Sequence, residues 1–222
     1  GKKKEKGKDM IILGIADNHE SHACILINGV LVAAVAEERL SRLKTDSSYP
    51  HRAIEKVISI ANIKEKDIDL VVFAGANDLP YLKVLREAAI FSVSDWVELQ
   101  ERYWKPKLYK NKPYNEIDRF HMFKHKIKDY INTDYYKGFF LNDISSSRHD
   151  RVLEFQNYRK EVVFNHLGIG HKKIKFLRHE DCHKAYGYYS SPNRKRNALI
   201  FTCEGGGDDS SATVSIINDH KI

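Results

Sequence analysis

In IILGIADNHESHACILINGVLVAAVA, residues 11–36, apolar runs alternate with two short polar turns, and this pattern is the clearest indication of the fold in the sequence. The runs at residues 11–16, 23–27 and 30–36 have the length and the side chains of β-strands. Asn28 and Gly29 separate the last two runs, and both residues tolerate the positive φ angles that a two-residue hairpin turn requires. The stretch therefore predicts a three-stranded β-meander, with a polar turn at residues 17–21.

Helices and strands alternate in most of the chain that follows. Apolar residues at helical spacing predict a helix over residues 51–62. The compact apolar run at residues 69–74 is typical of a buried parallel strand. Further helices are expected at residues 147–167 and 181–189, and further strands at residues 174–177, 198–202 and 211–217. This order predicts an α/β protein.

Residues 78–148 interrupt that alternation with an irregular pattern rich in Tyr, Lys and Trp, which we interpret as a helical insertion. Between Arg102 and Lys137, basic residues are interleaved with Tyr and Phe, which is typical of nucleic-acid binding but at least as typical of a solvated helical surface. Nucleic acid is therefore an alternative partner and not the favoured one. The expected core of the insertion comprises Phe91, Trp96, Leu99, Tyr103 and Trp104.

The composition suits a globular protein. The chain has 222 residues, a formal net charge of +7, a pI near 9.1 and 42% hydrophobic residues, which is enough for a buried core. No apolar run reaches the roughly 18 residues of a membrane-spanning helix. Residues 1–9 (GKKKEKGKD) are too polar for a signal peptide and predict a disordered basic tail. The sequence thus predicts a soluble cytoplasmic protein with no membrane partner.

His179 and His183 lie four residues apart in the segment RHEDCHKAY, residues 178–186. A helix places side chains i and i+4 on one face, so the two imidazoles can share a cation. Glu204, which follows the strand expected at residues 198–202, can add an oxygen ligand. Ordinary, partly exposed helix residues are the alternative interpretation. Cys182 points about 100° away from His183 on a helix and is not favoured as a ligand.

The strand before Glu204 leads into the acidic, glycine-rich turn CEGGGDDS, residues 203–210. Backbone N–H groups exposed by glycine can approach phosphate closely, which makes this turn a candidate phosphate cradle. A plain tight turn explains the glycines equally well. The candidate cofactor-binding residues are Gly205, Gly206, Gly207, Asp208 and Ser210.

Two segments resemble the carbamoyltransferase family that includes nodulation and antibiotic O-carbamoyltransferases. The first runs from Leu13 to Ile54 and contains EERLSRLKTD at residues 37–46, close to the family's EERFSRxKxD. The second is HEDCHKAYGYYSS at residues 179–191, which is similar to the family's HHxAHAxxAYxxSP. Two departures concern the site: Glu180 replaces the second histidine, and Glu204 stands where Asp is usual.

This resemblance implies the fold of the actin, hexokinase and Hsp70 group, in which two ribonuclease-H-like halves hold nucleotide between them. Residues 10–77 would begin the first half, residues 78–148 would be the insertion, residues 149–202 would complete that half with the metal helix, and residues 203–222 would start an incomplete second half. A missing C-terminal half, or a partner chain, would carry the domain that makes carbamoyl-adenylate.

The activity that the resemblance implies is transfer of a carbamoyl group from carbamoyl-adenylate to a hydroxyl of a small molecule, sugar or nucleotide. A divalent metal, either iron, zinc or magnesium, would be held by His179, His183 and Glu204 and act as a Lewis acid. A tRNA threonylcarbamoyl transferase-like enzyme is an alternative that the positive charge favours. A nucleotide- or metal-binding module without catalysis is another, which Glu204 and the missing half favour.

The ATP-derived carbamoyl-adenylate would be bound near Asp17, His19 and Lys44, according to the same resemblance. Lys44 would neutralise phosphate or a carbamoyl oxygen. His19 would move a proton or orient the acceptor hydroxyl, and Asp17 would act as a base or orient His19. A solvated loop lysine and a turn-capping histidine are the alternative interpretations of Lys44 and His19.

Overall fold

The computed structural model describes residues 8–81, 85, 91–114, 116–126, 135–136, 139, 147–192, 194–208 and 210–221. These residues form two compact units. The first unit comprises the described residues up to Asp78 and those from Gln156 onwards, and the second unit comprises those between Leu79 and Phe155. Most of the predicted basic tail, residues 1–7, lies outside the described residues.

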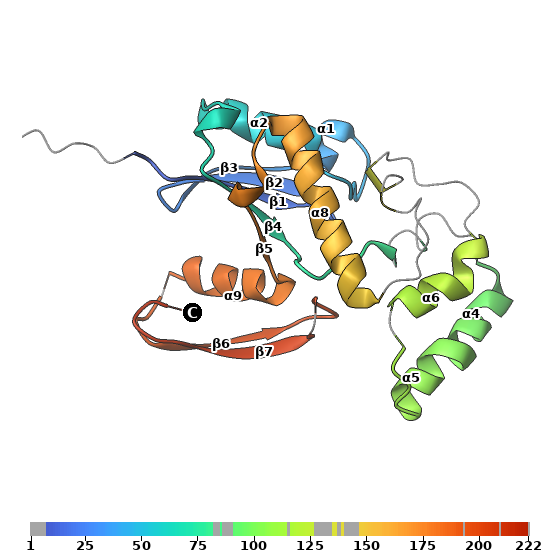
Figure 1. The fold of residues 1–222 in the computed structure, drawn as a ribbon. Helices are drawn as coiled ribbons and strands as arrows, with labels where there is room; N and C mark the ends of the chain where they lie inside the picture. The colour runs from blue at the N-terminus through green and yellow to red at the C-terminus, as the bar shows by residue number, and fades with distance from the viewer. Residues whose placement is uncertain are drawn as a thin grey trace, which may run out of the picture. The chain divides into compact units, whose positions relative to one another are not determined.

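A five-stranded mixed sheet forms the centre of the first unit (Figure 1). Its strand order is β3-β2-β1-β4-β5, with β1 antiparallel to β2, β2 antiparallel to β3, and β4 parallel to both β1 and β5. The meander and the parallel strand predicted at residues 69–74 are thereby confirmed. The strands are β1 (Ile11–Ala16), β2 (His22–Ile27), β3 (Val30–Ala36), β4 (Leu70–Ala74) and β5 (Ile174–Leu177).

The turn between β2 and β3 has the predicted backbone conformation. Asn28 and Gly29 both have positive φ, at 53° and 79°. The Asn28 side chain also accepts a 2.9 Å hydrogen bond from the backbone N–H of Met10. The turn thus connects β2 to β3 and ties the pair to the start of β1.

Helices cover the buried face of this sheet. Residues opposite one another across β1, β2 and β4, such as Leu13, Ile25 and Val71, are fully buried. Helix α2 (His51–Ala61) contacts β2 and β3 and buries its predicted apolar stripe. The remaining helical segments of this unit are α1 (Glu38–Ser41), most of α8 (Arg148–Leu167), α9 (His179–Tyr189) and the 3-10 turns Glu65–Asp67 and His171–Lys173.

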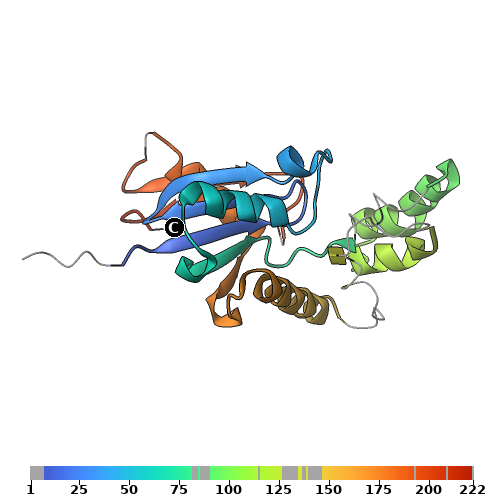
Figure 2. The same cartoon turned by 90° about the horizontal axis from the view of Figure 1, so that it is seen from above.

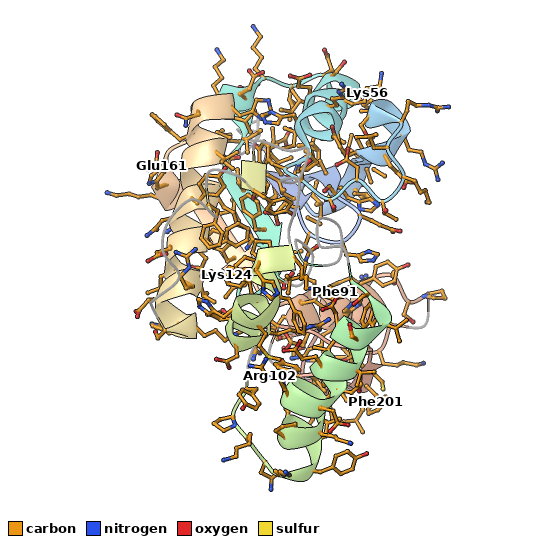
Figure 3. All side chains as sticks on the ribbon, turned by 90° about the vertical axis from the view of Figure 1, so that its right-hand side faces the viewer. Lys56, Phe91, Arg102, Lys124, Glu161 and Phe201 are labelled. Atoms are coloured by element: carbon orange, nitrogen blue, oxygen red, sulfur yellow. The ribbon has the colours of Figure 1, made fainter. Side chains whose placement is uncertain are left out.

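A separate two-stranded sheet, β6 (Ala198–Cys203) and β7 (Ala212–Ile217), follows α9. Figures 1 and 2 show this hairpin in two orientations. Its inner face packs on α9 through Ile200 and Ile217, which contact Tyr188. Its outer face, which includes Phe201 (Figure 3), remains exposed, with relative accessibilities between 67% and 74%. The large apolar residues of that outer face are Leu199, Phe201, Val214 and Ile216.

One close approach within the central sheet involves Gly14 and Cys24, which lie opposite one another in β1 and β2. A Cβ atom at Gly14 would lie 2.6 Å from Cys24 Sγ, well inside van der Waals contact. Burial raises the pKa of the Cys24 thiol above its ordinary value. Cys24 therefore acts as a small apolar side chain that leaves no room for a side chain at position 14.

The described residues of the second unit are mainly helical. They include α4 (Val93–Leu99), the π-helical turn Gln100–Trp104, α5 (Lys105–Tyr109), α6 (Glu116–Phe123) and the 3-10 turn Lys124–Lys126. Leu99 and Tyr103 are buried as expected, but Trp96 is 51% exposed, so its assignment to the core is wrong. Neither unit contains a helix, within the described residues, that is long and apolar enough to cross a membrane.

Candidate functional site

The parallel strands β1, β4 and β5 end at the same edge of the sheet. The segments that follow them therefore lie side by side, which is where α/β proteins commonly place their sites. A hydrogen bond of 2.9 Å from Gly75 N to Leu177 O joins two of these segments. Most of the predicted site residues belong to this edge or to the turn after β6.

His179, His183 and Glu204 converge there. Helix α9 begins at His179, and its first turn brings His183 onto the same face. The Nε2 atoms of the two histidines lie 2.9 Å apart, and Glu204 Oε2 lies 2.7 Å from His179 Nε2 and 3.2 Å from His183 Nε2. One ligand atom from each residue thus lies within 4.8 Å of the other two.

This cluster has the properties expected of a cation site. Two imidazole nitrogens and a carboxylate oxygen face one another, and all three can donate lone pairs to one ion. The second carboxylate oxygen, Glu204 Oε1, is buried and has no hydrogen-bond partner within the described residues. Buried oxygens of this kind are normally satisfied, so a cation at the cluster would supply a missing partner. The residues therefore fit a divalent metal.

Cys182 is a poor additional ligand. Burial is the main cause that raises the pKa of its thiol to about 11. At neutral pH the thiol consequently stays protonated, whereas metals bind the thiolate.

The acidic-glycine turn lies against the start of α9. Asp208 is buried, and its Oδ2 accepts hydrogen bonds from His179 N (3.1 Å) and Asn77 N (3.0 Å). The carboxylate thereby occupies the N-terminus of α9, a position that attracts anions. Gly205 and Gly206 are exposed, and a Cβ atom at either would meet nothing within 4 Å.

Ser210 and Gly207 contact Glu180, which the sequence indicated only as a departure from the family pattern. Glu180 is 1% exposed, and its Oε1 accepts from Ser210 N at 2.8 Å and from Ser210 Oγ at 3.2 Å. The close approach of Glu180 also explains the glycine at position 207, as its Cγ would lie 2.9 Å from a Cβ there.

Asp17, the residue after β1, forms a buried ion pair with Arg159 of α8. Arg159 Nε and a terminal nitrogen each donate to one oxygen of Asp17 at 2.8 Å, and the other terminal nitrogen donates to Gly75 O at 2.8 Å. Both residues are 1% exposed. Sequence reasoning missed Arg159, although it occupies a position in the apolar stripe of its helix with Phe155 and Val163, where an arginine is out of place.

Asp78 is a second residue that sequence reasoning missed. Its Oδ2 accepts a 3.0 Å hydrogen bond from Asn18 Nδ2. Burial raises the pKa of Asp78, and the negative charges of Asp208 and Asp17 raise it further, against the opposing effects of Asn18 and Arg159. A carboxyl group with a displaced pKa at the end of a parallel strand is typical of a functional site.

The structure places His19 and Lys44 on the surface. His19 is exposed in the turn after β1. Lys44 Nζ contacts both oxygens of Glu38, at 3.1 and 3.2 Å. Hydrogen bonds from Thr45 N and then from Lys44 lower the pKa of Glu38. Within the described part of the chain, no hydrogen bond links His19 or Lys44 to the cluster of His179, His183 and Glu204.

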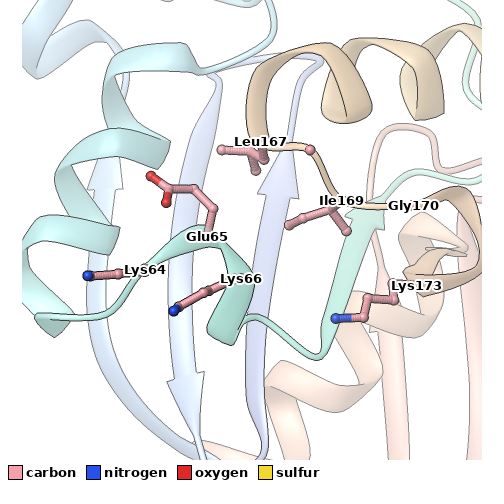
Figure 4. A pocket seen from close by; sticks show the side chains of 8 residues that line it. Lys64, Glu65, Lys66, Leu167, Ile169, Gly170 and Lys173 are labelled. Atoms are coloured by element: carbon pink, nitrogen blue, oxygen red, sulfur yellow. The ribbon is translucent and has the colours of Figure 1, made fainter.

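A pocket lies at the opposite end of the parallel strands, before β4 and β5 begin (Figure 4). It is lined by the 3-10 turn after α2 and by the loop after α8, and contains three exposed lysines, Lys64, Lys66 and Lys173. None of the predicted site residues lines it. This pocket and the cluster of His179, His183 and Glu204 therefore lie at different ends of the parallel strands.

Comparisons with known proteins identify the family of the chain. A family model described as carbamoyltransferase N-terminus matches residues 11–221. The chain is 33% identical to an uncharacterized protein of Synechocystis sp. over 102 residues, which are 44% of this chain and 17% of that protein. It is 34% identical to the nodulation protein NolNO of Sinorhizobium fredii over 55 residues, 25% of this chain and 8% of that protein.

An uncharacterized protein of Methanocaldococcus jannaschii is 27% identical over 190 residues, 80% of this chain. The chain spans at most 27% of the length of these three relatives. The family model, by contrast, covers nearly every residue from the first strand to the end of the described chain. The chain therefore belongs to the carbamoyltransferase N-terminus family.

Proposed function

We propose that the chain is the N-terminal part of an enzyme that transfers a carbamoyl group from carbamoyl-adenylate to a hydroxyl of a small molecule, sugar or nucleotide. Membership of the family supports carbamoyl transfer as the general reaction. The observation that carries the proposal is the convergence of His179, His183 and Glu204 on one point at the carboxyl end of the parallel strands.

A divalent metal held by these three residues is part of the proposal. Two imidazole nitrogens and one carboxylate oxygen suit zinc or iron, whereas magnesium prefers oxygen ligands, so we favour the first two metals. When bound, the metal would supply Lewis-acid polarisation of the carbamoyl group and neutralise charge on the adenylate phosphate. Glu204 Oε1, which is buried, offers a second oxygen from the same side chain.

Asp17 and His19 would have different roles toward the acceptor hydroxyl. Arg159 binds both oxygens of Asp17, which favours an orienting role for Asp17 over that of a base. His19, exposed in the same turn, would then take the proton of the acceptor hydroxyl. The hydroxyl oxygen forms the bond to the carbamoyl carbon as the bond from that carbon to the phosphate oxygen breaks, and AMP leaves.

Phosphate would be bound by Lys44 and the glycine turn. Lys44 is 80% exposed, and exposed ion pairs are worth little, so its amine can leave Glu38 for a phosphate oxygen. The exposed backbone at Gly205 and Gly206 leaves space for a phosphate group. Asp208 accepts two backbone N–H groups and would hold the turn against α9.

The five-stranded sheet would belong to the first of two ribonuclease-H-like halves, and residues 203–222, which include β7 of the β6–β7 hairpin, would start the second. The exposed outer face of that hairpin supports a covering C-terminal part or partner chain, because apolar patches of this kind usually mark an interaction surface. The same C-terminal part or partner would carry the domain that makes carbamoyl-adenylate from ATP.

Elemental analysis of bound metal tests the proposal directly. The wild type is compared with the double variant His179→Ala/His183→Ala, with and without AMP. The matched control is His22→Ala/His171→Ala, which removes two exposed histidines elsewhere in the same unit. We expect stoichiometric metal in the wild type and the control, and loss in the double variant.

Retention of stoichiometric metal by His179→Ala/His183→Ala would overturn the site. If metal and AMP bind but the complete polypeptide transfers no carbamoyl group to any hydroxyl acceptor, the non-catalytic module is correct instead.

A further inference from the structure

Glu180 occupies an unusual position beside the metal cluster. It follows His179 directly in α9 and yet is 1% exposed, because its side chain points toward the turn after β6 and not toward solvent. A buried carboxylate costs considerable free energy unless hydrogen bonds or charges compensate. Here the backbone N–H and the hydroxyl of Ser210 both donate to Glu180 Oε1, at 2.8 and 3.2 Å.

The turn is shaped to receive this side chain. A Cβ atom at Gly207 would lie 2.9 Å from Glu180 Cγ and 3.0 Å from Glu180 Cδ, as well as 2.7 Å from Ser210 O. The φ angle of Gly207 is not positive, so the backbone conformation does not require glycine there. Glycine is required by the space that Glu180 and the turn itself occupy.

The same turn carries the carboxylate of the cluster. It begins at Glu204, whose N–H donates to Ser211 O at 2.8 Å and so closes the loop. On its other side Asp208 accepts from the backbone N–H of His179 at 3.1 Å. The turn is therefore held on α9 at two points, by Asp208 at the first residue of the helix and by Glu180 at the second.

We propose that Glu180 is a positioning residue that sets the distance from Glu204 to His179 and His183 by fixing the turn on α9. The inference rests on the proposed metal site. It also gives a reason for glutamate where the family pattern has histidine: one carboxylate oxygen accepts from both donors of Ser210, whereas a neutral imidazole has a single acceptor nitrogen.

Cobalt(II) titration of the purified chain tests this inference, with absorption spectra as a report on ligand geometry and thermal unfolding measured in parallel. Glu180→Ala should weaken cobalt binding about 10-fold to 100-fold, the usual effect of losing a group that orients metal ligands, and should change the spectrum. Glu180→Gln keeps the shape and an acceptor oxygen, and should restore the wild-type spectrum.

Asp181→Ala is the matched control, since Asp181 is the next residue of α9 and its carboxylate pairs with Arg178 and Lys184. It should leave the affinity and the spectrum unchanged. Gly207→Ala provides a second, independent variant in case Glu180→Ala does not fold. It should weaken cobalt binding through the same contact, with Glu180 intact.

If the folded Glu180→Ala variant binds cobalt with wild-type affinity and gives the wild-type spectrum, even with a lower Tm, the inference about Glu180 is overturned. The proposed metal site itself would not be affected by that result. The absence of cobalt binding by the wild type would instead contradict the proposed site, and with it this inference.

Discussion

The two ends of the parallel strands β1, β4 and β5 differ in how they hold charge. At the carboxyl ends, Asp17, Arg159 and Asp208 are buried, with at most 7% of each exposed. At the amino ends, the lysines around the pocket are exposed. Buried charges are costly unless they are paired, whereas solvated lysines around a hollow cost little. Desolvated charge and the pocket therefore mark opposite ends of this sheet, and the proposed site lies at the end with the desolvated charge.

The largest expected difference between the ends concerns basic side chains. Arg159→Met should lower the free energy of unfolding by about 3–5 kcal/mol, because Asp17 stays buried without its guanidinium partner. Lys66→Met, at the amino end, should change it by less than about 0.5 kcal/mol. Urea unfolding of both variants measures the two values. Similar decreases in the free energy of unfolding for Arg159→Met and Lys66→Met would contradict the proposed difference between the two ends.

Two glycines with positive φ lie at opposite ends of the parallel strands. Gly75, after β4, has φ 84°, and a Cβ atom there would lie 3.2 Å from Asn18 Nδ2. Gly168, at the amino end, has φ 67° and open space around it. Gly168→Ala should cost about 1 kcal/mol from backbone conformation alone, and Gly75→Ala about 2–3 kcal/mol because crowding is added. Thermal unfolding distinguishes them, and a larger loss in Gly168→Ala would refute the assignment of crowding to the carboxyl end.

The smallest expected effects are shifts in Tm on removal of one carboxylate, and they should have opposite signs at the two ends of the parallel strands. The pKa of Asp78 is raised, chiefly by burial, so its charge destabilises the folded state at neutral pH. Asp78→Asn should therefore raise the Tm at pH 7, and the gain should disappear as the pH falls below about 3.8, where the carboxyl is protonated in the folded and the unfolded chain.

Asp69, just before β4, provides the opposite case. Its pKa is lowered, first by the hydrogen bond from Lys8 and then by that from the backbone N–H of Ile11. Its contribution to stability is present above the unfolded pKa and lost as the pH falls through the folded pKa. Asp69→Asn should lower the Tm at pH 7 and have little effect in acid. Tm shifts of the same sign for Asp78→Asn and Asp69→Asn at pH 7 would count against the interpretation.

Periodicity predicted most strands and helices of the first unit, because elements such as β1, β4 and α2 bury residues that repeat along the sequence. The hairpin at Asn28 and Gly29 and the histidine pair on α9 depend on local spacing, and local spacing is visible in a sequence. The ion pair of Asp17 with Arg159 joins residues 142 positions apart, so no local pattern reveals it. Glu180 was equally hidden, since its partner Ser210 lies in a different element.

The prediction for Trp96 rested on residue type alone, in a segment without a regular apolar pattern. Trp96 and Leu99 both belong to α4, before the π-helical turn Gln100–Trp104 begins. Asp95 and Leu99 are buried in α4, and Trp96 lies beside that face.

The contact between Gly14 and Cys24 has an evolutionary consequence. A Cβ atom at position 14 would meet the sulfur of residue 24 at 2.6 Å, so the two positions cannot change independently. Alanine at position 14 therefore requires either a different rotamer of Cys24 or a smaller residue at position 24, so the substitutions at the two positions should be coupled. Across homologues, the residue opposite a non-glycine at position 14 should accordingly tend to be glycine, alanine or serine.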